Sequence, residues 1–317
     1  MNFWKQLKKP IMALAPMANV TDAAFRQIIA KYGKPDVMFT EFTSCDGLVS
    51  AGRGKLLVDL KFTPAEHPIV AQFFGSKPEN FFNCAQLAQE LKFDGIDINM
   101  GCPDRAVERQ GAGAALIKTP ELAQEIIAET KRGAPDLPVS VKTRLGYNKN
   151  ILEEWLPKLL ETGLAAITIH ARTRKEMSDV DAHWDQVKRA VEITDDMGKE
   201  TLILGNGDIG DIGEAKVKVQ ETGCDGVMIG RGIFGNPWLF SSERDYKTIT
   251  LEEKLAVMLE HTFLFEKMFK DIKSFDVMKK HYKAYVAGFD GAKELRVKLM
   301  EAKSAEEVSQ VITPYLG

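Results

Sequence analysis

The sequence predicts an α/β fold, a (β/α)8 barrel followed by a small helical domain, and three observations lead to it. Short, nearly continuous apolar segments alternate with amphipathic segments, as in a parallel sheet covered by helices. Eight such units occupy about 240 of the 317 residues, which is the size of a TIM barrel. No convincing strand follows Phe240. We therefore expect the barrel in residues 1–242 and the helical domain in residues 243–317.

Each expected strand is a short apolar run, and the expected helices between them carry apolar residues at helical spacing. The strands are Ile11–Ala15, Val37–Thr40, Ile69–Phe73, Gly95–Asn99, Val139–Thr143, Ala166–His170, Thr201–Gly205 and Gly226–Ile229. The helices are Ala23–Tyr32, Glu79–Leu91, Pro120–Arg132, Ile151–Thr162, Trp184–Thr194 and Gly213–Glu221. A doubly wound open sheet is the alternative, but eight regular repeats without a Gly-x-Gly-x-x-Gly turn favour the barrel.

The region after Phe240 is expected to be helical and locally basic. Its helices are Leu251–Phe269, Phe275–Val286, Ala292–Met300 and Ala305–Val311, with Gly288 and Gly291 between them. Residues 267–303 contain ten Lys and Arg against five Asp and Glu, including Lys279, Lys280 and Lys283. Such a cluster indicates either a solvated helix face or a phosphate-binding surface.

Composition bounds the class of protein. The net charge of −3 gives no global sign of nucleic-acid binding, so an RNA surface has to be local. The four cysteines lack metal-ligand spacing, which argues against a zinc site and for a reduced compartment. Lys5, Lys8 and Lys9 precede an apolar run as in a signal peptide, but Pro16 interrupts that run and a helix cap follows it. We expect a cytoplasmic monomer without a membrane span or a metal.

The segment IDINMGCPDRAVERQGAGAALI (96–117) carries the most functional information. Alternating apolar residues end at Gly101, which indicates a buried strand followed by a tight turn. Cys102 comes just after that strand, and Asn99 lies three residues upstream. A thiol and an amide at such a place suit proton transfer onto a bound polar ring. The alternative is an inert, buried cysteine.

Polar or backbone-presenting groups follow every expected strand, whereas the strand interiors are mainly apolar. Because barrel enzymes carry their chemistry at the carboxyl ends of the strands, this concentration indicates an enzyme. In chain order the groups are Pro16-Met17-Ala18, Glu41, Gln72, Asn99 with Cys102, Lys142 with Arg144, His170 with Arg172, Asn206-Gly207-Asp208 and Gly230-Arg231.

Two glycine-rich turns suggest a phosphate site. GNGDI (205–209) and IGRG (229–232) are expected at the starts of the seventh and eighth helices, where backbone N–H groups and the helix dipole favour an anion. Arg231 adds a charge-assisted contact. The alternative is that Asn-Gly marks only a turn.

A phosphate at these turns places the rest of a cofactor over the barrel mouth. Lys142 suits the N1/O2 edge of a flavin, Gln72 suits the polar edge near O4 and N5, and the Pro16–Ala18 turn offers backbone. Lys142 also fits a Schiff-base nucleophile, as in an aldolase. His170 remains open between a ligand, an acid and a core residue.

Seven ordered segments resemble the flavin-dependent tRNA-dihydrouridine synthases. They are APMANVTDAAFR (15–26), TEF (40–42), DINMGCPDRAVERQGAGAALI (97–117), VSVKTRLG (139–146), TIHARTR (168–174), NGDIG (206–210) and GVMIGRGIFGNPWLF (226–240). The segment KKHYKAYVAGFDGAKELR in the helical region is similar to the RNA-binding domain of that family. The family commonly has Gly where this chain has Asn19, a residue that tolerates left-handed backbone.

The resemblance implies FMN as cofactor, NADPH as reductant and tRNA as substrate. The residues implied to hold FMN are Pro16, Met17, Ala18, Gln72, Lys142, His170, Asn206, Gly207, Asp208, Gly230 and Arg231. Asn99, Arg144 and Arg172 are implied to hold the uracil or nearby phosphates. Lys279, Lys280 and Lys283 would bind RNA.

The implied reaction reduces a uridine to 5,6-dihydrouridine. FMN supplies a hydride to C6, and Cys102 protonates C5 of a uracil taken out of its stack. The alternatives are a dihydroorotate dehydrogenase-like enzyme acting on a free pyrimidine, and a dihydrouridine synthase acting on rRNA. A small-molecule enzyme would not need the basic helical domain.

Overall fold

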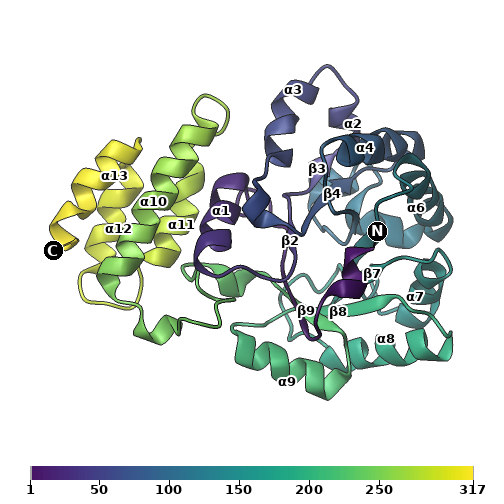
Figure 1. Ribbon diagram of the computed structural model, residues 1–317. Coiled ribbons are helices and arrows are strands. Elements are labelled where there is room, and N and C mark those ends of the chain that lie inside the picture. The colour runs from purple at the N-terminus through teal and green to yellow at the C-terminus, as the bar shows by residue number, and fades with distance from the viewer. Residues whose placement is uncertain (1, 317) are drawn as a thin grey trace.

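The computed structural model of the protein describes residues 2–316 and contains a parallel barrel with a group of helices at one side (Figure 1). Neighbouring strands pair in the order β1-β9-β8-β7-β6-β5-β4-β2. A bridge between Ala13 and Val37 joins the two ends of this sheet, so the barrel closes between β1 and β2. The predicted fold class is confirmed.

The strands agree closely with the sequence prediction. They are β1 (Ile11–Leu14), β2 (Met38–Phe39), β4 (Ile69–Phe74), β5 (Gly95–Met100), β6 (Val139–Arg144), β7 (Ala166–His170), β8 (Leu202–Asn206) and β9 (Gly226–Ile229). One further strand, β3 (Thr43–Ser44), pairs with β4 and was not expected. It has two residues, too few to show any periodicity.

The six expected barrel helices are present as α1 (Ala23–Tyr32), α4 (Pro78–Glu90), α6 (Pro120–Gly133), α7 (Leu152–Leu160), α8 (Trp184–Asp196) and α9 (Ile212–Thr222). Three single-turn helices were not expected: α2 (Cys45–Leu48), α3 (Arg53–Leu56) and α5 (Arg105–Glu108). The expectation of an eighth barrel helix after the last strand is wrong, because β9 is followed by the 3-10 turn Arg231–Ile233.

The C-terminal helices are α10 (Leu251–Phe269), α11 (Met278–Tyr285), α12 (Ala292–Glu301) and α13 (Ala305–Ile312). The helix expected over Phe275–Val286 begins instead as a 3-10 turn and becomes α-helical at Met278. Figure 1 shows these helices beside α1. Their apolar core includes Ala24 and Ile28 of α1, so α1 belongs to both halves of the molecule.

Two polar arrangements lie where the helices meet the barrel. His261 of α10 and His281 of α11 are fully buried, and their rings pack on Phe25 of α1 with centroids 5.1 and 4.6 Å away. The Lys273 ammonium inserts between the Glu41 and Asp59 carboxylates at 2.6 and 2.8 Å.

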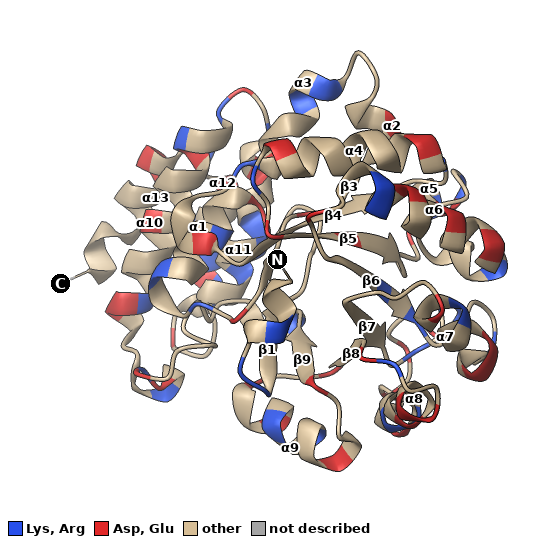
Figure 2. Ribbon diagram, turned by 45° about the vertical axis from the view of Figure 1, so that its right-hand side comes forward, with Lys and Arg blue, Asp and Glu red and all other residues tan. Residues whose placement is uncertain are grey.

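Charged residues of both signs cover the surrounding helices, with a basic segment on α3 (Figure 2). Within residues 2–316, no helix combines the length and the hydropathy that crossing a bilayer requires. Residues 1 and 317, the outer ends of the two expected domains, lie outside the described residues.

Candidate active site

Cys102 lies directly beyond β5, where its partial burial favours the protonated form of the thiol. The alternation Ile96, Ile98 and Met100 continues to the end of β5, and Gly101 turns the chain before Cys102. The side chain is half-buried. Burial, more than any neighbouring charge, raises the pKa of this thiol above its ordinary value. The thiol therefore carries a proton at neutral pH and can act as an acid.

Gln72 and Lys142 lie within their strands, which corrects their expected placement at strand ends. β4 continues to Phe74 and β6 continues to Arg144. Gln72 pairs in register with Asp97, and Asn99 pairs with Lys142. The Asn99 amide donates to the Gln72 carbonyl at 3.1 Å.

The Lys142 ammonium is an enclosed cation at the barrel mouth. It donates a 3.0 Å hydrogen bond to the side-chain carbonyl of Asn206 on β8. Burial, reinforced by the nearby Arg144 guanidinium, lowers the pKa of Lys142 to about 8. The side chain thus remains mostly charged at neutral pH, but its charge is poorly solvated and would be stabilised by an anionic partner.

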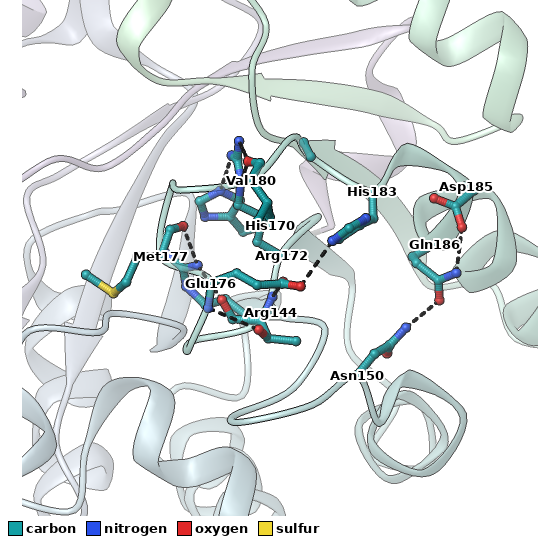
Figure 3. A network of polar contacts seen from close by, with 12 residues as sticks. Arg144, Asn150, His170, Arg172, Glu176, Met177, Val180, His183, Asp185 and Gln186 are labelled. Carbon is teal, nitrogen blue, oxygen red and sulfur yellow. Dashed lines mark hydrogen bonds and ion pairs between the residues drawn. The ribbon is translucent and has the colours of Figure 1, made fainter.

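The surroundings of His170 favour the neutral form of its imidazole at neutral pH. Burial, followed by the charges of Lys142, Arg144 and Arg172, strongly lowers its pKa. His170 pairs in register with Asn206, which places it at the end of β7 as expected. Its position next to Arg172 is visible in Figure 3.

Most of the predicted phosphate-binding residues line a cavity of about 340 Å³. It is lined by Pro103, Arg144, His170, Met177, Ser178, Asn206, Gly207, Asp208, Ile209, Met228, Gly230 and Arg231. A larger cavity, of about 640 Å³, opens at the other end of the strands and contains none of the predicted site residues. We therefore place the site at the carboxyl end of the barrel.

The phosphate expectation needs one correction, because neither glycine-rich turn starts an α-helix. α9 begins only at Ile212, and its first turn is already capped by Asp211, which accepts from the Glu214 N–H at 2.8 Å. The second turn leads into the 3-10 turn after β9. An anion would thus depend on loop N–H groups and on Arg231 rather than on helix dipoles.

Asp208 organises two cations around this cavity. Its carboxylate pairs with Arg172 and, at 2.8 Å, with Arg231. Burial raises the pKa of Asp208, but the hydrogen bonds from Arg172 and from the Ala182 N–H, together with the two cationic charges, lower it below its ordinary range. The carboxylate is therefore ionised, and a phosphate could meet only the backbone or the neighbouring cations of this residue.

Arg144 and Arg172 hold the segment between β7 and α8. Both residues are buried, with 6% and 2% of their surfaces exposed. Arg144 donates to the carbonyl of Met177 at 3.2 Å, and Arg172 donates to the carbonyl of Val180 at 2.7 Å (Figure 3). The sequence analysis missed this structural role, because the accepting carbonyls lie in a loop without periodicity.

Asp97 is a second residue that the sequence analysis missed as part of the site. It is 1% exposed in the middle of β5 and accepts a 2.7 Å hydrogen bond from Gln72. A charged residue between Ile96 and Ile98 is itself a signal, since it faces the barrel interior with Asn99.

The predicted RNA-binding lysines lie on α11, apart from the residues around the cavity. Lys279 forms an ion pair with Asp276 at 2.5 Å, whereas Lys280 and Lys283 are exposed. Asn19 has the left-handed φ of 53° that the turn after β1 requires, and its N–H donates to Glu41 at 2.5 Å. The expectation that asparagine preserves this turn is confirmed.

Comparisons with known proteins agree with this arrangement. The sequence profile of the family described as dihydrouridine synthase (Dus) matches residues 13–315. A probable tRNA-dihydrouridine synthase from Staphylococcus aureus (strain Mu50) is 42% identical, over 99% of this chain and 95% of the relative. A probable tRNA-dihydrouridine synthase 2 from Bacillus subtilis (strain 168) is 41% identical, over 99% and 96%.

Solved structures support the fold. Morphinone reductase superposes with a TM-score of 0.53 at 12% identity, over 72% of this chain and 84% of that protein. An old yellow enzyme homologue from Zymomonas mobilis superposes with a TM-score of 0.51 at 11% identity, over 71% and 86%. At these identities the likeness concerns the barrel alone.

Proposed function

Because this chain belongs to the dihydrouridine synthase family, an oxidoreductase family, we propose that it uses FMN and NADPH to reduce uridines of tRNA to 5,6-dihydrouridine. The observation that carries the proposal is the half-buried Cys102 at the carboxyl end of the barrel, whose neighbour Pro103 lines a cavity together with Arg144 and Arg231. The relatives named for tRNA support the choice of substrate.

The residues around the cavity fit FMN. Arg231 supplies a largely exposed cation at its edge, and Lys142 supplies an enclosed one. Gly207 has a φ of 131°, and a Cβ there would come within 2.9 Å of the Ala182 side chain, so the backbone at this point suits only glycine. We assign the cofactor to Pro16, Met17, Ala18, Gln72, Lys142, His170, Asn206, Gly207, Asp208, Gly230 and Arg231.

When bound and reduced by NADPH, FMN would supply the hydride that the reaction adds to C6 of the uracil. The Lys142 ammonium stabilises negative charge at the polar edge of the ring system. His170, held neutral, can offer a hydrogen bond without competing for a proton. Cys102 moves its proton to C5, on which negative charge would otherwise accumulate.

The substrate side of the site combines direct and indirect contacts. Asn99 accepts the Cys102 N–H through its side-chain carbonyl, and we assign it to the substrate side on the strength of this position. Arg144 and Arg172 act on the substrate through the loop that they hold and through their positive charge. On α11, Lys280 and Lys283 provide exposed charge for RNA phosphates, and Lys279 is a third, already paired, cation.

The test is a reconstituted reaction. The purified protein should bind about one FMN, NADPH should bleach it, and unmodified tRNA transcripts should gain two mass units at specific uridines. Free uridine, orotate and rRNA fragments serve as competing substrates. A protein that neither retains nor rebinds FMN, or one that reduces orotate but leaves tRNA unchanged, would overturn the proposal.

A further inference from the structure

A chain of side-chain hydrogen bonds leads from the barrel interior to the turn that carries Cys102. It begins at the buried carboxylate of Asp97 on β5. Ser140 donates its hydroxyl to one oxygen at 2.6 Å, and Gln72 donates its amide N–H to the other at 2.7 Å. Both oxygens of Asp97 are therefore engaged by donors on the neighbouring strands.

The chain continues through two amides. The Gln72 carbonyl accepts from Asn99 Nδ2 at 3.1 Å. The Asn99 carbonyl, in turn, accepts from the backbone N–H of Gly101 at 3.2 Å and from that of Cys102 at 2.9 Å. The last acceptor in the chain thus fixes the turn after β5.

The direction of this chain is set at both ends, by the acceptor-only carboxylate of Asp97 and by the donor-only backbone N–H groups of Gly101 and Cys102. An amide can face a neighbour with either its carbonyl or its amino group, whereas an ionised carboxylate can only accept. Gln72 must therefore turn its amino group to Asp97, which leaves its carbonyl for Asn99. Asn99 then has to present its own carbonyl to the Cys102 N–H.

We propose that Asp97 is a positioning residue for the Cys102 turn, because its carboxylate imposes one hydrogen-bond direction on Gln72 and Asn99. The consequence for catalysis rests on the proposed function of Cys102, but the structural effect does not. Burial raises the pKa of Asp97 to about 6, against the effects of Ser140, Gln72 and the Lys142 cation, so the carboxylate is mainly ionised at neutral pH.

Asp97→Asn removes this constraint at nearly constant volume. The new amide can either accept from Gln72 or donate to it, so only the N–H groups at the turn still favour the original direction and the reversed one becomes accessible. In the reversed direction Asn99 turns its amino group toward the N–H groups of Gly101 and Cys102, and both of these hydrogen bonds are lost. We expect amide hydrogen exchange at Cys102 to accelerate about five- to tenfold, the equivalent of one hydrogen bond.

A second variant restores a single direction in the opposite sense. In Asp97→Asn/Asn99→Asp, the amide at position 97 can donate to the Gln72 carbonyl, and Gln72 can donate to the carboxylate at position 99. That carboxylate again accepts from the Cys102 N–H. Slow exchange at Cys102 should return to within about twofold of the unaltered protein.

Ser140→Ala is the matched control. It removes the other donor to Asp97, and so costs thermal stability, but it leaves the direction of the chain unchanged. A merely structural role for Asp97 would make Asp97→Asn and Ser140→Ala behave alike. Positioning predicts a faster Cys102 exchange in Asp97→Asn only.

The experiment measures exchange of single amides in the purified holoenzyme, with flavin reduction by NADPH and dihydrouridine formation measured on the same samples. Asp97→Asn should slow dihydrouridine formation more than it slows flavin reduction. Unchanged exchange at Cys102 in Asp97→Asn, or fast exchange that persists in the double variant, would overturn the inference. Absence of dihydrouridine formation in the unaltered enzyme would instead refute the proposed function and leave the exchange result decisive.

Discussion

The Lys142 ammonium lies where burial opposes its charge, which makes its ionisation a direct probe of the cofactor site. Its pKa of about 8 means that the side chain is charged below pH 8 and loses its charge as the pH rises through that value. An electron-rich partner binds the charged form better. FMN affinity should therefore be highest near pH 7 and should decline above pH 8.

Lys142→Met should weaken FMN binding about 10- to 100-fold at pH 7, as expected for the loss of a hydrogen bond from a charged group. The remaining affinity should no longer decline between pH 7 and 9. Fluorescence titration of the apoenzyme measures both effects. Lys131→Met is the control, since Lys131 binds the carbonyls of Thr162 and Gly163 by the cavity at the opposite end of the barrel. Identical pH profiles for Lys142→Met and the unaltered protein would contradict the assignment.

The sequence identified site residues whose chemistry stands out against their surroundings. Lys142 and His170 are polar residues in or at the end of apolar strands, Cys102 follows such a strand, and the sequence predicts all three at the barrel mouth. Asp97 has the same signature, but no turn follows it, so its role became visible only from its contacts. The carbonyl partners of Arg144 and Arg172 depend on loop conformation, which local sequence does not determine.

Among the elements, the packing of α10 and α11 on α1 buries two histidines without polar partners. None of the four ring nitrogens of His261 and His281 has a hydrogen-bond partner among the described residues. Burial, and to a lesser extent the Lys280 charge, lowers the pKa of His281 to about 3. The histidine in the unfolded chain titrates near 6.5. The folded state is therefore favoured fully above pH 6.5 and loses stability as the pH falls toward 3.

His281→Phe should be nearly neutral for stability at pH 7, because the replaced nitrogens make no hydrogen bond. Between pH 7 and 5 the variant should lose about 2 kcal/mol less stability than the unaltered protein does. Urea denaturation at the two pH values measures the difference. Lys283→Gln, at an exposed position of the same helix, should leave the loss unchanged. Equal acid sensitivity of His281→Phe and the unaltered protein would contradict the burial argument.

The elements were predictable where periodicity is long and were missed where it is short. All eight principal strands and the helices of the barrel and of the C-terminal group follow apolar patterns that extend over several residues. β3, α2, α3 and α5 consist of one turn or one pair of residues, and tertiary contacts rather than local preference determine them. The helix expected directly after β9 is likewise replaced by a single 3-10 turn, and tertiary contacts rather than local preference determine this turn.

For the whole molecule, Lys273 is the main ionic link between the C-terminal helices and the barrel mouth. Its side chain is 14% exposed and lies between carboxylates that are 7% and 18% exposed. These two carboxylates outweigh burial and raise the pKa of Lys273. One of them, Glu41, also accepts the Asn19 N–H in the turn after β1.

Lys273→Met should cost about 3 kcal/mol in the free energy of unfolding, because it leaves two enclosed carboxylates without a cation. Chemical denaturation measures the loss. Lys270→Met, on an exposed neighbour, should cost less than about 0.5 kcal/mol. A loss no larger than that of the control would show that the ion pairs contribute little to the contact between the two parts.

The proposed RNA surface is also a property of the whole molecule, since with a net charge of −3 any RNA contact would depend on a local basic patch. Neutralising Lys280 and Lys283 together should lower the salt dependence of log K for tRNA by about 1.4 to 1.8, two phosphate contacts in all. FMN content should stay constant. Lys188→Gln/Lys216→Gln, on exposed residues of α8 and α9, is the matched control. Equal salt slopes for both double variants would place the RNA elsewhere.

The most direct test of the account is the dihydrouridine yield of Cys102→Ala, measured by mass spectrometry of tRNA nucleosides after single turnover with prereduced enzyme. The account predicts normal FMN content and normal reduction by NADPH, with dihydrouridine formation slowed about 10²- to 10⁴-fold by the loss of the general acid. Cys224→Ala, which removes a buried thiol at the opposite end of the barrel, should react at the rate of the unaltered protein. Dihydrouridine formation by Cys102→Ala at the full rate would contradict the account.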